Sequence, residues 1–432
     1  MITKIKRARP GWIITLGFAS VILFGSVLLW LPITHQPNAI VTYVDALFTS
    51  TSAVCVTGLI AIDTAEHFNV FGRAVVATLI QIGGLGVTSV GAAFILLAQR
   101  KMGLRSRILI KEGLNLNSLQ GVVRLVKAVL KLTLLFESIG FVLSFLVFVQ
   151  DYPAWSAMGI ALFHTISAFN NSGFDILGGL TNLIPYQSNV LLNLTTCGLI
   201  IFGGLGFCVI QEVWEKKKWH SFTMNTKIVL SMTAFLLITG TLLLKLSDDV
   251  TWLGAFFQST SARTAGFSTY NLGTFSNTGL FVLIILMFIG ASPGSTGGGI
   301  KTTTTFTIFR TIQAIATNKQ CVAFHRRIPM ESIIKAFVIM TLALTLVSVN
   351  TALICVWEPD CSFLQVLFEV VSGFGTVGLS TGITPHLLDS SKLLLCLTMF
   401  FGRLGPLTIA CLWSYKSITG LVSYPEEKIT IG

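Results

Sequence analysis

Charged residues are scarce in this chain. Only 11% of its 432 residues are Asp, Glu, Lys or Arg and 53% are hydrophobic, whereas an ordinary globular domain carries about 25% charged residues. So little charge cannot cover the surface of a soluble protein of this length. Together with a mean hydropathy of +0.79, the composition indicates an integral membrane protein.

Residues that carry enzyme chemistry are also sparse. The six histidines are scattered along the chain, and the eight cysteines show no C-x-x-C spacing. A membrane enzyme would need His, Ser, Asp or Glu gathered at one depth, and a metal centre would need ligands at short, regular spacings. We therefore expect neither an enzyme nor a covalent cofactor. A disulfide between Cys355 and Cys361 stays open.

Apolar runs fill most of the chain. Each complete run approaches the ~20 residues that cross a bilayer. The complete runs are 12–31, 74–98, 132–149, 190–213, 228–244, 333–356 and 392–413. A further run, 278–310, is interrupted by glycines and hydroxyl residues. The pattern predicts eight spans, the first of which is a membrane anchor and not a cleaved signal peptide.

Basic residues are concentrated in every second loop between the runs, near 4–9, 100–111, 216–218 and 319–327. By the positive-inside rule these loops are cytoplasmic, as are both termini, in a plasma membrane of the bacterial (inner) type. The formal charge of +11 therefore belongs to membrane topology and contact with lipid. Nucleic-acid binding is not expected, because the charges flank apolar spans and form no basic face interleaved with aromatics.

Four short segments resemble one another. They read ALFTSTSAVCVTGL (46–59), ALFHTISAFNNSGF (161–174), AFFQSTSARTAGF (255–267) and VLFEVVSGFGTVGL (366–379). Each holds about ten residues that would rise only about 15 Å as a helix, too little to cross a bilayer. Each then ends in a glycine followed by Leu or Phe. We interpret them as re-entrant half-helices, each followed by a glycine strand.

A second set of glycines follows each half-helix: QIGGLG (81–86), IFGGLG (201–206), FIGASPG (288–294) and FFGRLG (400–405). The sequence thus predicts an all-α membrane protein of four tandem units, each made of a span, a half-helix, a strand and a span. The predicted units are 12–98, 121–213, 228–316 and 333–415. Their shared orientation predicts a pseudo-fourfold ring around one pore and excludes the inverted repeats of secondary transporters.

The glycine strands are predicted to line that pore. Irregular backbone at membrane depth is tolerated where it lines a wet cavity, and inward carbonyl oxygens can replace the water around a cation. Glycine suits a strand that turns successive carbonyls to one side. For the second set of glycines an alternative stays open, namely close helix packing through small residues.

Six ordered motifs carry a family resemblance: TSAVCVTGL, FNNSGFD, TSARTAGFST, SGFGTVGLSTG, GASPGSTGGGIKT and GRLGPLT. With them the chain resembles the Trk/Ktr/HKT superfamily of potassium transporters, and its eight spans resemble the KtrB-type membrane subunit. The resemblance implies potassium uptake by a homodimer with one pore per subunit, sodium dependence, and gating by a cytosolic ring of nucleotide-binding KtrA-type subunits. It also implies that K⁺ binds at filter carbonyls only.

The resemblance also assigns the filter by position. The residues are Val56, Thr57, Gly58, Asn171, Ser172, Gly173, Thr264, Ala265, Gly266, Thr376, Val377 and Gly378. A glycine at Gly58, where sodium-preferring plant relatives carry serine, favours potassium. The alternative is a sodium or non-selective monovalent cation transporter of the same fold.

The interrupted run holds STGGGIKTTTT, which superficially resembles a phosphate loop. Ile300 separates Gly299 from Lys301, however, and apolar spans flank the motif, so nucleotide binding is not expected there. We predict instead an intramembrane gate loop over 290–305, with Lys301 repelling cations, and with Arg403 as an intramembrane charge beneath the filter. The predicted gate residues are Gly290, Gly294, Ser295, Thr296, Gly297, Gly298, Gly299, Lys301 and Arg403.

Overall fold

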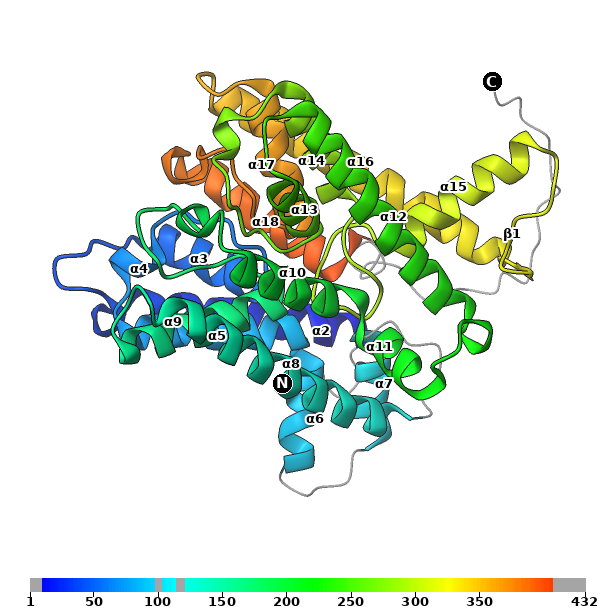
Figure 1. Cartoon of the computed structure of the whole chain (residues 1–432), viewed down its shortest axis with the longest axis horizontal. Coiled ribbons are helices and arrows are strands. Elements are labelled where there is room, and N and C mark those ends of the chain that lie inside the picture. Colours follow the sequence, from blue (N-terminus) through cyan, green and yellow to red (C-terminus); the bar gives the residue numbers. More distant parts are fainter. Residues whose placement is uncertain (1–9, 98–102, 114–120, 407–432) are drawn as a thin grey trace.

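The computed structural model describes residues 10–97, 103–113 and 121–406. Helices dominate this part of the chain, and its only sheet pairs the two-residue strands β1 (Val322–Ala323) and β2 (Arg326–Arg327). Within the described residues Cys355 and Cys361 are both free thiols. Figure 1 shows the helices gathered into one bundle, from which α15 (Thr302–Ala316) and the hairpin extend to one side.

Among the described residues, four helices are individually long and apolar enough to cross a membrane. They are α2 (Pro10–Trp30), α8 (Val122–Phe148), α12 (Met224–Ser247) and α16 (Met330–Trp357). Large apolar side chains on them stand exposed, such as Phe24 on α2 and Phe235 on α12. Exposed apolar surface of this kind requires lipid around it, so the chain is a multi-pass membrane protein.

A short, buried helix follows each long one. These half-helices are α3 (Tyr43–Cys55), α9 (Ala154–Phe169), α13 (Trp252–Ser261) and α17 (Phe363–Gly375). Threonine or serine side chains accept hydrogen bonds from the first turn of three of them, at Thr42, Thr251 and Ser362, which fixes where those helices begin. Their longest member has 16 residues and rises only about 24 Å.

The repeated aromatic explains how the half-helices are anchored. Phe48, Phe163, Phe257 and Phe368 hold the same place in the four segments, and all are buried. The Leu or Phe after each repeat glycine is buried as well, at Leu59, Phe174, Phe267 and Leu379. Burying such side chains stabilises by about 1.5–3 kcal/mol each, so every segment is held at both ends.

The second crossing is divided in the first three units, which corrects the expectation that only the third is interrupted. In the second unit α10 (Val190–Leu205) and α11 (Phe207–Lys216) meet at 95°. In the first unit α5 (Val70–Leu85) stops before α6 (Val87–Leu97). Gly86 and Gly206 end their helices with φ of 82° and 92°, a conformation that glycine adopts without a steric penalty.

The third unit shows the same division, and in the fourth unit the helix ends at the equivalent glycine. α18 (Asp389–Leu404) ends at Gly405, where φ is 88°, and the rest of the predicted run 392–413 lies outside the described residues. In the third unit, residues 289–301 separate α14 (Asn277–Phe288) from α15. The remaining helices are α4 (Thr64–His67) and α7 (Leu104–Gly113).

The units close into a ring. Each second crossing packs on the half-helix of the next unit: α5 contacts α9, α10 contacts α13, α14 contacts α17, and α18 returns to contact α3. The cyclic order of packing places the four half-helices around one centre, and Figure 1 shows α18 and α3 side by side although they lie at opposite ends of the sequence.

Candidate functional site

Four strands of three residues leave the ends of the half-helices and meet at the centre of the ring. We call them the central strands: 56–58, 171–173, 264–266 and 376–378. All of their residues are buried. In every strand the first residue has a positive φ, at Val56, Asn171, Thr264 and Thr376. The third residue is a glycine, also at positive φ.

A positive φ at Val56, Thr264 or Thr376 is costly. Left-handed backbone costs a residue with a side chain about 1–2 kcal/mol, and such strain persists mainly at functional sites. The strained conformation directs the carbonyls, because alternating backbone angles turn successive carbonyls toward the same side of the strand. The third position of each strand could not carry a side chain in any case, because a Cβ there would collide with the neighbouring strand.

The glycines touch one another's strands in a closed cycle. A Cβ on Gly58 would lie 2.0 Å from the Ser172 carbonyl oxygen, and one on Gly173 would lie 2.5 Å from that of Ala265. A Cβ on Gly266 would lie 2.1 Å from the Val377 oxygen, and one on Gly378 would lie 2.1 Å from the Thr57 oxygen. The first strand thus faces the second, the second the third, the third the fourth, and the fourth the first.

The carbonyls of these strands lack protein partners. Of the twelve backbone oxygens, only that of Gly173 accepts a hydrogen bond from any described residue. More than about 90% of buried backbone groups in folded proteins are paired. Eleven unpaired, buried carbonyls around one centre therefore form a set of oxygen ligands that are available to a bound ion. Oxygen dipoles of this kind suit a desolvated cation.

Serines on the half-helices hold the strands in place. Ser52 and Ser372 each accept a hydrogen bond at 3.0 Å from the glycine N–H of their own strand, Gly58 and Gly378. Ser261 donates instead to the Phe267 carbonyl, while Ser167 Oγ has no partner among the described residues. This role explains the serine of the first and fourth units, but the serines of the second and third units do not share it.

The second set of glycines lets helices approach closely. A Cβ on Gly83 would lie 2.0 Å from the Val54 carbonyl oxygen, one on Gly203 2.0 Å from that of Phe169, and one on Gly402 1.9 Å from that of Phe374. In three units, therefore, the second crossing presses directly against the end of its own half-helix. The packing alternative holds for these glycines, in addition to the helix breaks one or a few residues later.

The intramembrane loop, residues 289–301, lies against the first residues of the central strands. A Cβ on Gly297 would lie 2.3 Å from Thr264 Oγ1, and the Gly298 N–H donates to Thr376 Oγ1 at 2.9 Å. Backbone N–H groups of the loop also donate to carbonyls of neighbouring units: Ser292 to Gly204 at 3.1 Å, Thr296 to Gly203 at 3.2 Å and Gly299 to Gly402 at 3.3 Å. The loop therefore covers the end of the ring where the half-helices finish.

Arg403 joins this loop to the first unit. Its guanidinium donates to the carbonyls of Thr296 and Gly83, and to that of Gly84 at 3.3 Å. Arg403 therefore caps backbone carbonyls and contacts the loop through one set of hydrogen bonds. It makes no ion pair with any described residue.

Lys301 points back to its own loop. Its ammonium donates to the Gly297 carbonyl at 2.6 Å and lies 3.5 Å from that of Gly298, and it precedes the first residue of α15. The bonds place a positive charge on the segment that contacts Thr264 and Thr376. Desolvated by the surrounding protein, such a charge opposes a cation nearby more strongly than it would in water.

Two other charges in the half-helix regions contact neutral groups. Glu369 forms no ion pair with any described residue; its carboxylate accepts from the Ser380 hydroxyl at 2.7 Å, the Thr381 N–H at 2.8 Å and the Thr384 hydroxyl at 2.7 Å. It thereby holds the chain that leaves the fourth central strand. Arg263, beside the third central strand, reaches Thr233 on α12 at 3.5 Å.

Asp175 lies just beyond the second central strand, outside the membrane-spanning helices. Burial, together with the nearby Asp63 carboxylate, raises its pKa to about 7 against the opposing hydrogen bonds from the Leu177 N–H and the Asn182 amide. An aspartate of the sequence motif FNNSGFD therefore titrates near neutrality at this end of the ring, opposite the intramembrane loop.

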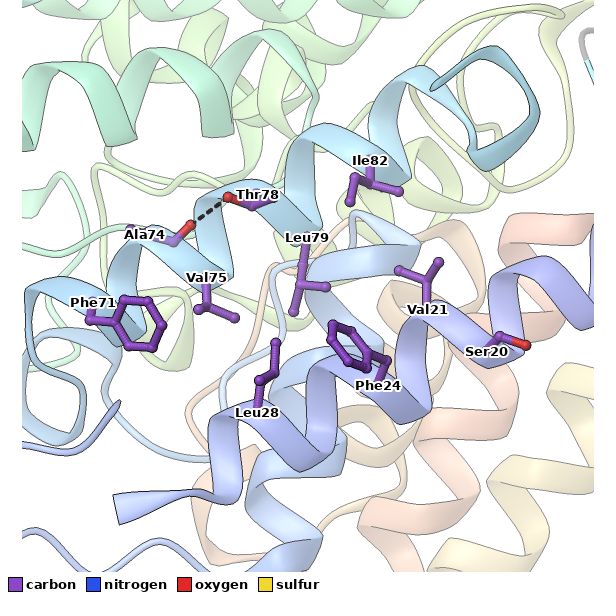
Figure 2. Close-up of a pocket in the computed structure, with 10 residues that line it drawn as sticks. All are labelled: Ser20, Val21, Phe24, Leu28, Phe71, Ala74, Val75, Thr78, Leu79 and Ile82. Atoms are coloured by element: carbon purple, nitrogen blue, oxygen red, sulfur yellow. Dashed lines mark hydrogen bonds between the residues drawn. The ribbon is translucent and has the colours of Figure 1, made fainter. Parts of the chain in front are cut away.

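A groove of about 390 Å³ between α2 and α5 has a different character. Figure 2 shows apolar side chains such as Phe24, Leu28 and Leu79 around it, and its one drawn hydrogen bond runs from Thr78 to the Ala74 carbonyl. Nothing in this lining would replace the water of an ion. Among the described residues, no group of three or more His, Cys, Asp or Glu could hold a metal.

Four units that surround unpaired carbonyls within a bundle of membrane-length helices define a membrane cation transporter. The family model described as "Cation transport protein", TrkH, matches residues 14–253 and 233–418. The chain belongs to this family, and within it to the KtrB type of the Trk/Ktr superfamily. Its relatives are cation transporters and not enzymes.

Among relatives, the Ktr system potassium uptake protein B of Vibrio alginolyticus is 38% identical, over 99% of this chain and 96% of the relative. The potassium/sodium uptake protein NtpJ of Enterococcus hirae is 37% identical, over 99% and 98%. The solved structure of the potassium transporter TrkH from Vibrio parahaemolyticus superposes with a TM-score of 0.75 at 18% identity, covering 94% of this chain and 86% of that one. That likeness concerns the fold.

Proposed function

We propose that the chain is the ion-conducting subunit of a potassium uptake system, with the central strands as its selectivity filter. The eleven unpaired, buried carbonyls carry this proposal. They give a cation oxygen ligands in place of its hydration shell, and burial without such a partner would cost about 1–3 kcal/mol for each group. The names of the Ktr relatives support potassium as the ion.

A sodium or less selective monovalent cation transporter is the second candidate. The relative from Enterococcus hirae is named for uptake of both potassium and sodium, so the shared architecture is compatible with either ion. The filter also has one glycine per unit. Sodium as an activating or coupled ion belongs to the same proposal, and a flux assay with each ion present and absent separates the two roles.

We further propose that the intramembrane loop is the gate. Its contacts with Thr264 and Thr376, the first residues of two central strands, support this proposal. The Lys301 charge lies on that loop, and Arg403 ties the loop to α5. A cation leaving the filter would meet both the backbone of the loop and a positive charge, until the loop moves aside.

The proposal extends to assembly and topology. The relatives named as protein B of a Ktr system support a complex with a regulatory partner, which we propose is a KtrA-type nucleotide-binding ring beneath a homodimer of this chain. The concentration of basic residues in every second loop supports cytoplasmic termini, in a bacterial inner membrane. The four units keep the bounds 12–98, 121–213, 228–316 and 333–415 in this proposal.

Gly58→Ser tests the filter. The new Cβ would lie 2.0 Å from the Ser172 carbonyl, so the strands must separate and their oxygens lose the geometry that fits potassium. We expect the ratio of potassium to sodium uptake into liposomes to fall about tenfold, the effect of losing about 1.4 kcal/mol of discrimination.

Gly198→Ser is the matched control, because a Cβ there meets no atom within 4 Å. Size-exclusion chromatography of both proteins would show whether each remains folded. A folded Gly58→Ser protein with the wild-type ion ratio would contradict the assignment of the filter.

A further inference from the structure

One central carbonyl differs from the other eleven. Gly173 is the last residue of the second strand, and its oxygen accepts a hydrogen bond from Asn182 Nδ2 at 3.2 Å. The corresponding oxygens of Gly58, Gly266 and Gly378 accept none from any described residue. The pseudo-fourfold symmetry of the ring is therefore broken at its outer end, opposite the intramembrane loop.

The contacts of Asn182 fix the orientation of its amide. Its Oδ1 accepts from the backbone N–H groups of Leu183 at 2.9 Å and Ser268 at 3.1 Å. Its Nδ2 faces the Gly173 oxygen and Asp175 Oδ2, the latter at 3.0 Å. Because N–H groups only donate and these oxygens only accept, exchanging the amide atoms would break all four bonds.

The backbone of Asn182 suits this position. Its φ is 51°, in the left-handed region that asparagine tolerates better than most residues. The side chain joins the chain leaving the second strand to Ser268, two residues beyond Gly266 of the third strand. The Asn182 side chain therefore links the second and third units by hydrogen bonds, and its bond to Gly173 is not a chance surface contact.

We propose, resting on the filter assignment above, that Asn182 is a specificity-determining residue that weakens potassium preference at the outermost carbonyl ring. Its bond occupies one of the two lone pairs of the Gly173 oxygen and draws that dipole toward the amide. The outermost ring then offers three unshared oxygens and one whose field toward an ion is weakened. Since the larger potassium ion uses more oxygen ligands than sodium, weakening one of the four disfavours potassium.

The double variant Asn182→Asp/Asp175→Asn tests this inference directly. It exchanges the two side chains, so the net charge, a hydrogen bond between positions 175 and 182, and an acceptor for Ser268 N–H are all kept. The donor to the Gly173 oxygen is lost, and a carboxylate oxygen at position 182 takes its place beside that carbonyl. We expect the potassium to sodium uptake ratio of the full-length protein in liposomes to rise about fivefold. The Gly173 oxygen becomes fully available to the ion, and the gain in discrimination corresponds to about one hydrogen bond.

Asn182→Gly gives a second measurement, because glycine accepts the left-handed backbone and removes the donor without adding a charge. Asn38→Asp is the control: Asn38 also has a positive φ, of 66°, but it is exposed and far from the strands in sequence. That control should keep the wild-type ratio.

An unchanged potassium to sodium ratio in both Asn182 variants would overturn the proposal. A fall of the ratio in both would also overturn it, because it would show that Asn182 only stiffens the strands. Gly58→Ser separates this failure from failure of the filter assignment. If Gly58→Ser lowers the ratio while the Asn182 variants do not alter it, the filter stands and only the role of Asn182 is lost.

Discussion

At the scale of single residues, the site is made by backbone conformation more than by side chains. Val56, Asn171, Thr264 and Thr376 each adopt a positive φ, and all carbonyls of their strands except that of Gly173 lack a partner among the described residues. Side chains act behind the strands, where Ser52, Ser372 and Glu369 hold the backbone at its ends. The chemistry of the site is therefore that of peptide oxygens.

Asp175 gives a prediction at this scale. Its native pKa of about 7 lies above the value near 3.9 expected in an unfolded chain. Between these values the native state binds more protons than the unfolded state, so this residue makes stability fall as pH rises from about 4 to about 7. Asp175→Asn should therefore gain Tm relative to wild type on going from pH 5 to pH 8.

Thermal unfolding of both detergent-solubilised proteins at the two pH values measures this difference. The hydrogen bonds lost in the variant would shift its Tm by a similar amount at both values, so the change between them isolates the ionisation. A Tm difference that is the same at pH 5 and pH 8 would contradict the raised pKa.

At the scale of elements, the existence and C-terminal ends of the half-helices were predictable, and of the broken second crossings only the third was. The half-helices recur four times with similar aromatic, serine and glycine positions, but they begin three to seven residues before the repeated segments, at Tyr43, Ala154, Trp252 and Phe363. The bend at Gly206 depends on one backbone angle in an apolar run, which hydropathy does not detect. The divisions of the first and second units therefore became visible only in the folded structure.

The intramembrane loop gives the prediction for this scale. Thr376→Val removes the hydroxyl that accepts from the Gly298 N–H while keeping the branched shape of the side chain. The loop loses a buried contact worth about 1 kcal/mol, so potassium flux in the absence of a regulatory partner should rise about fivefold.

Thr57→Val is the control, since the Thr57 hydroxyl is buried without a partner and its removal breaks no hydrogen bond. Liposome flux at equal protein content compares the three proteins. A Thr376→Val protein as closed as the Thr57→Val protein would remove this contact from the mechanism of gating.

At the scale of the whole molecule, the ring must close between units that are far apart in sequence. The first and fourth units meet where α3 contacts α18, and there Lys392 Nζ lies 3.0 Å from Asp45 Oδ1 with both side chains nearly buried. The ring itself was predictable from the repeat. This ion pair was not, because nothing in the sequence relates residues 45 and 392.

Lys392→Met should destabilise the protein strongly, because it leaves the Asp45 carboxylate buried without its partner. Removing one member of a buried pair costs about 3–5 kcal/mol, measured as a loss of Tm in detergent. Adding Asp45→Asn should recover much of that loss.

The exposed pair of Lys335 and Glu331 within α16 provides the comparison. Lys335→Met should change stability by no more than about 1 kcal/mol. Equal losses for Lys392→Met and Lys335→Met would show that the ring does not depend on the buried pair.

The role of Asn182, like the pairing of Lys392 with Asp45, could not be predicted from the sequence. Its partner Gly173 was predicted as a filter residue from the repeat, but Asn182 lies in an outer loop without a counterpart in the other units. Its contacts with Ser268 come from the packing of the second unit on the third. Symmetry in the sequence identifies the repeated parts of such a site, whereas the side chains that break the symmetry need the folded structure.

Anomalous diffraction from thallium, a potassium substitute, tests the central claim most directly. Crystals of the full-length protein grown with Tl⁺ should show peaks on the axis of the central strands, within ligand distance of the unpaired carbonyls of Thr57, Ser172, Ala265 and Val377. Peaks that are absent from this axis, in a protein that transports potassium in liposomes, would contradict the assignment of these carbonyls as the ion path.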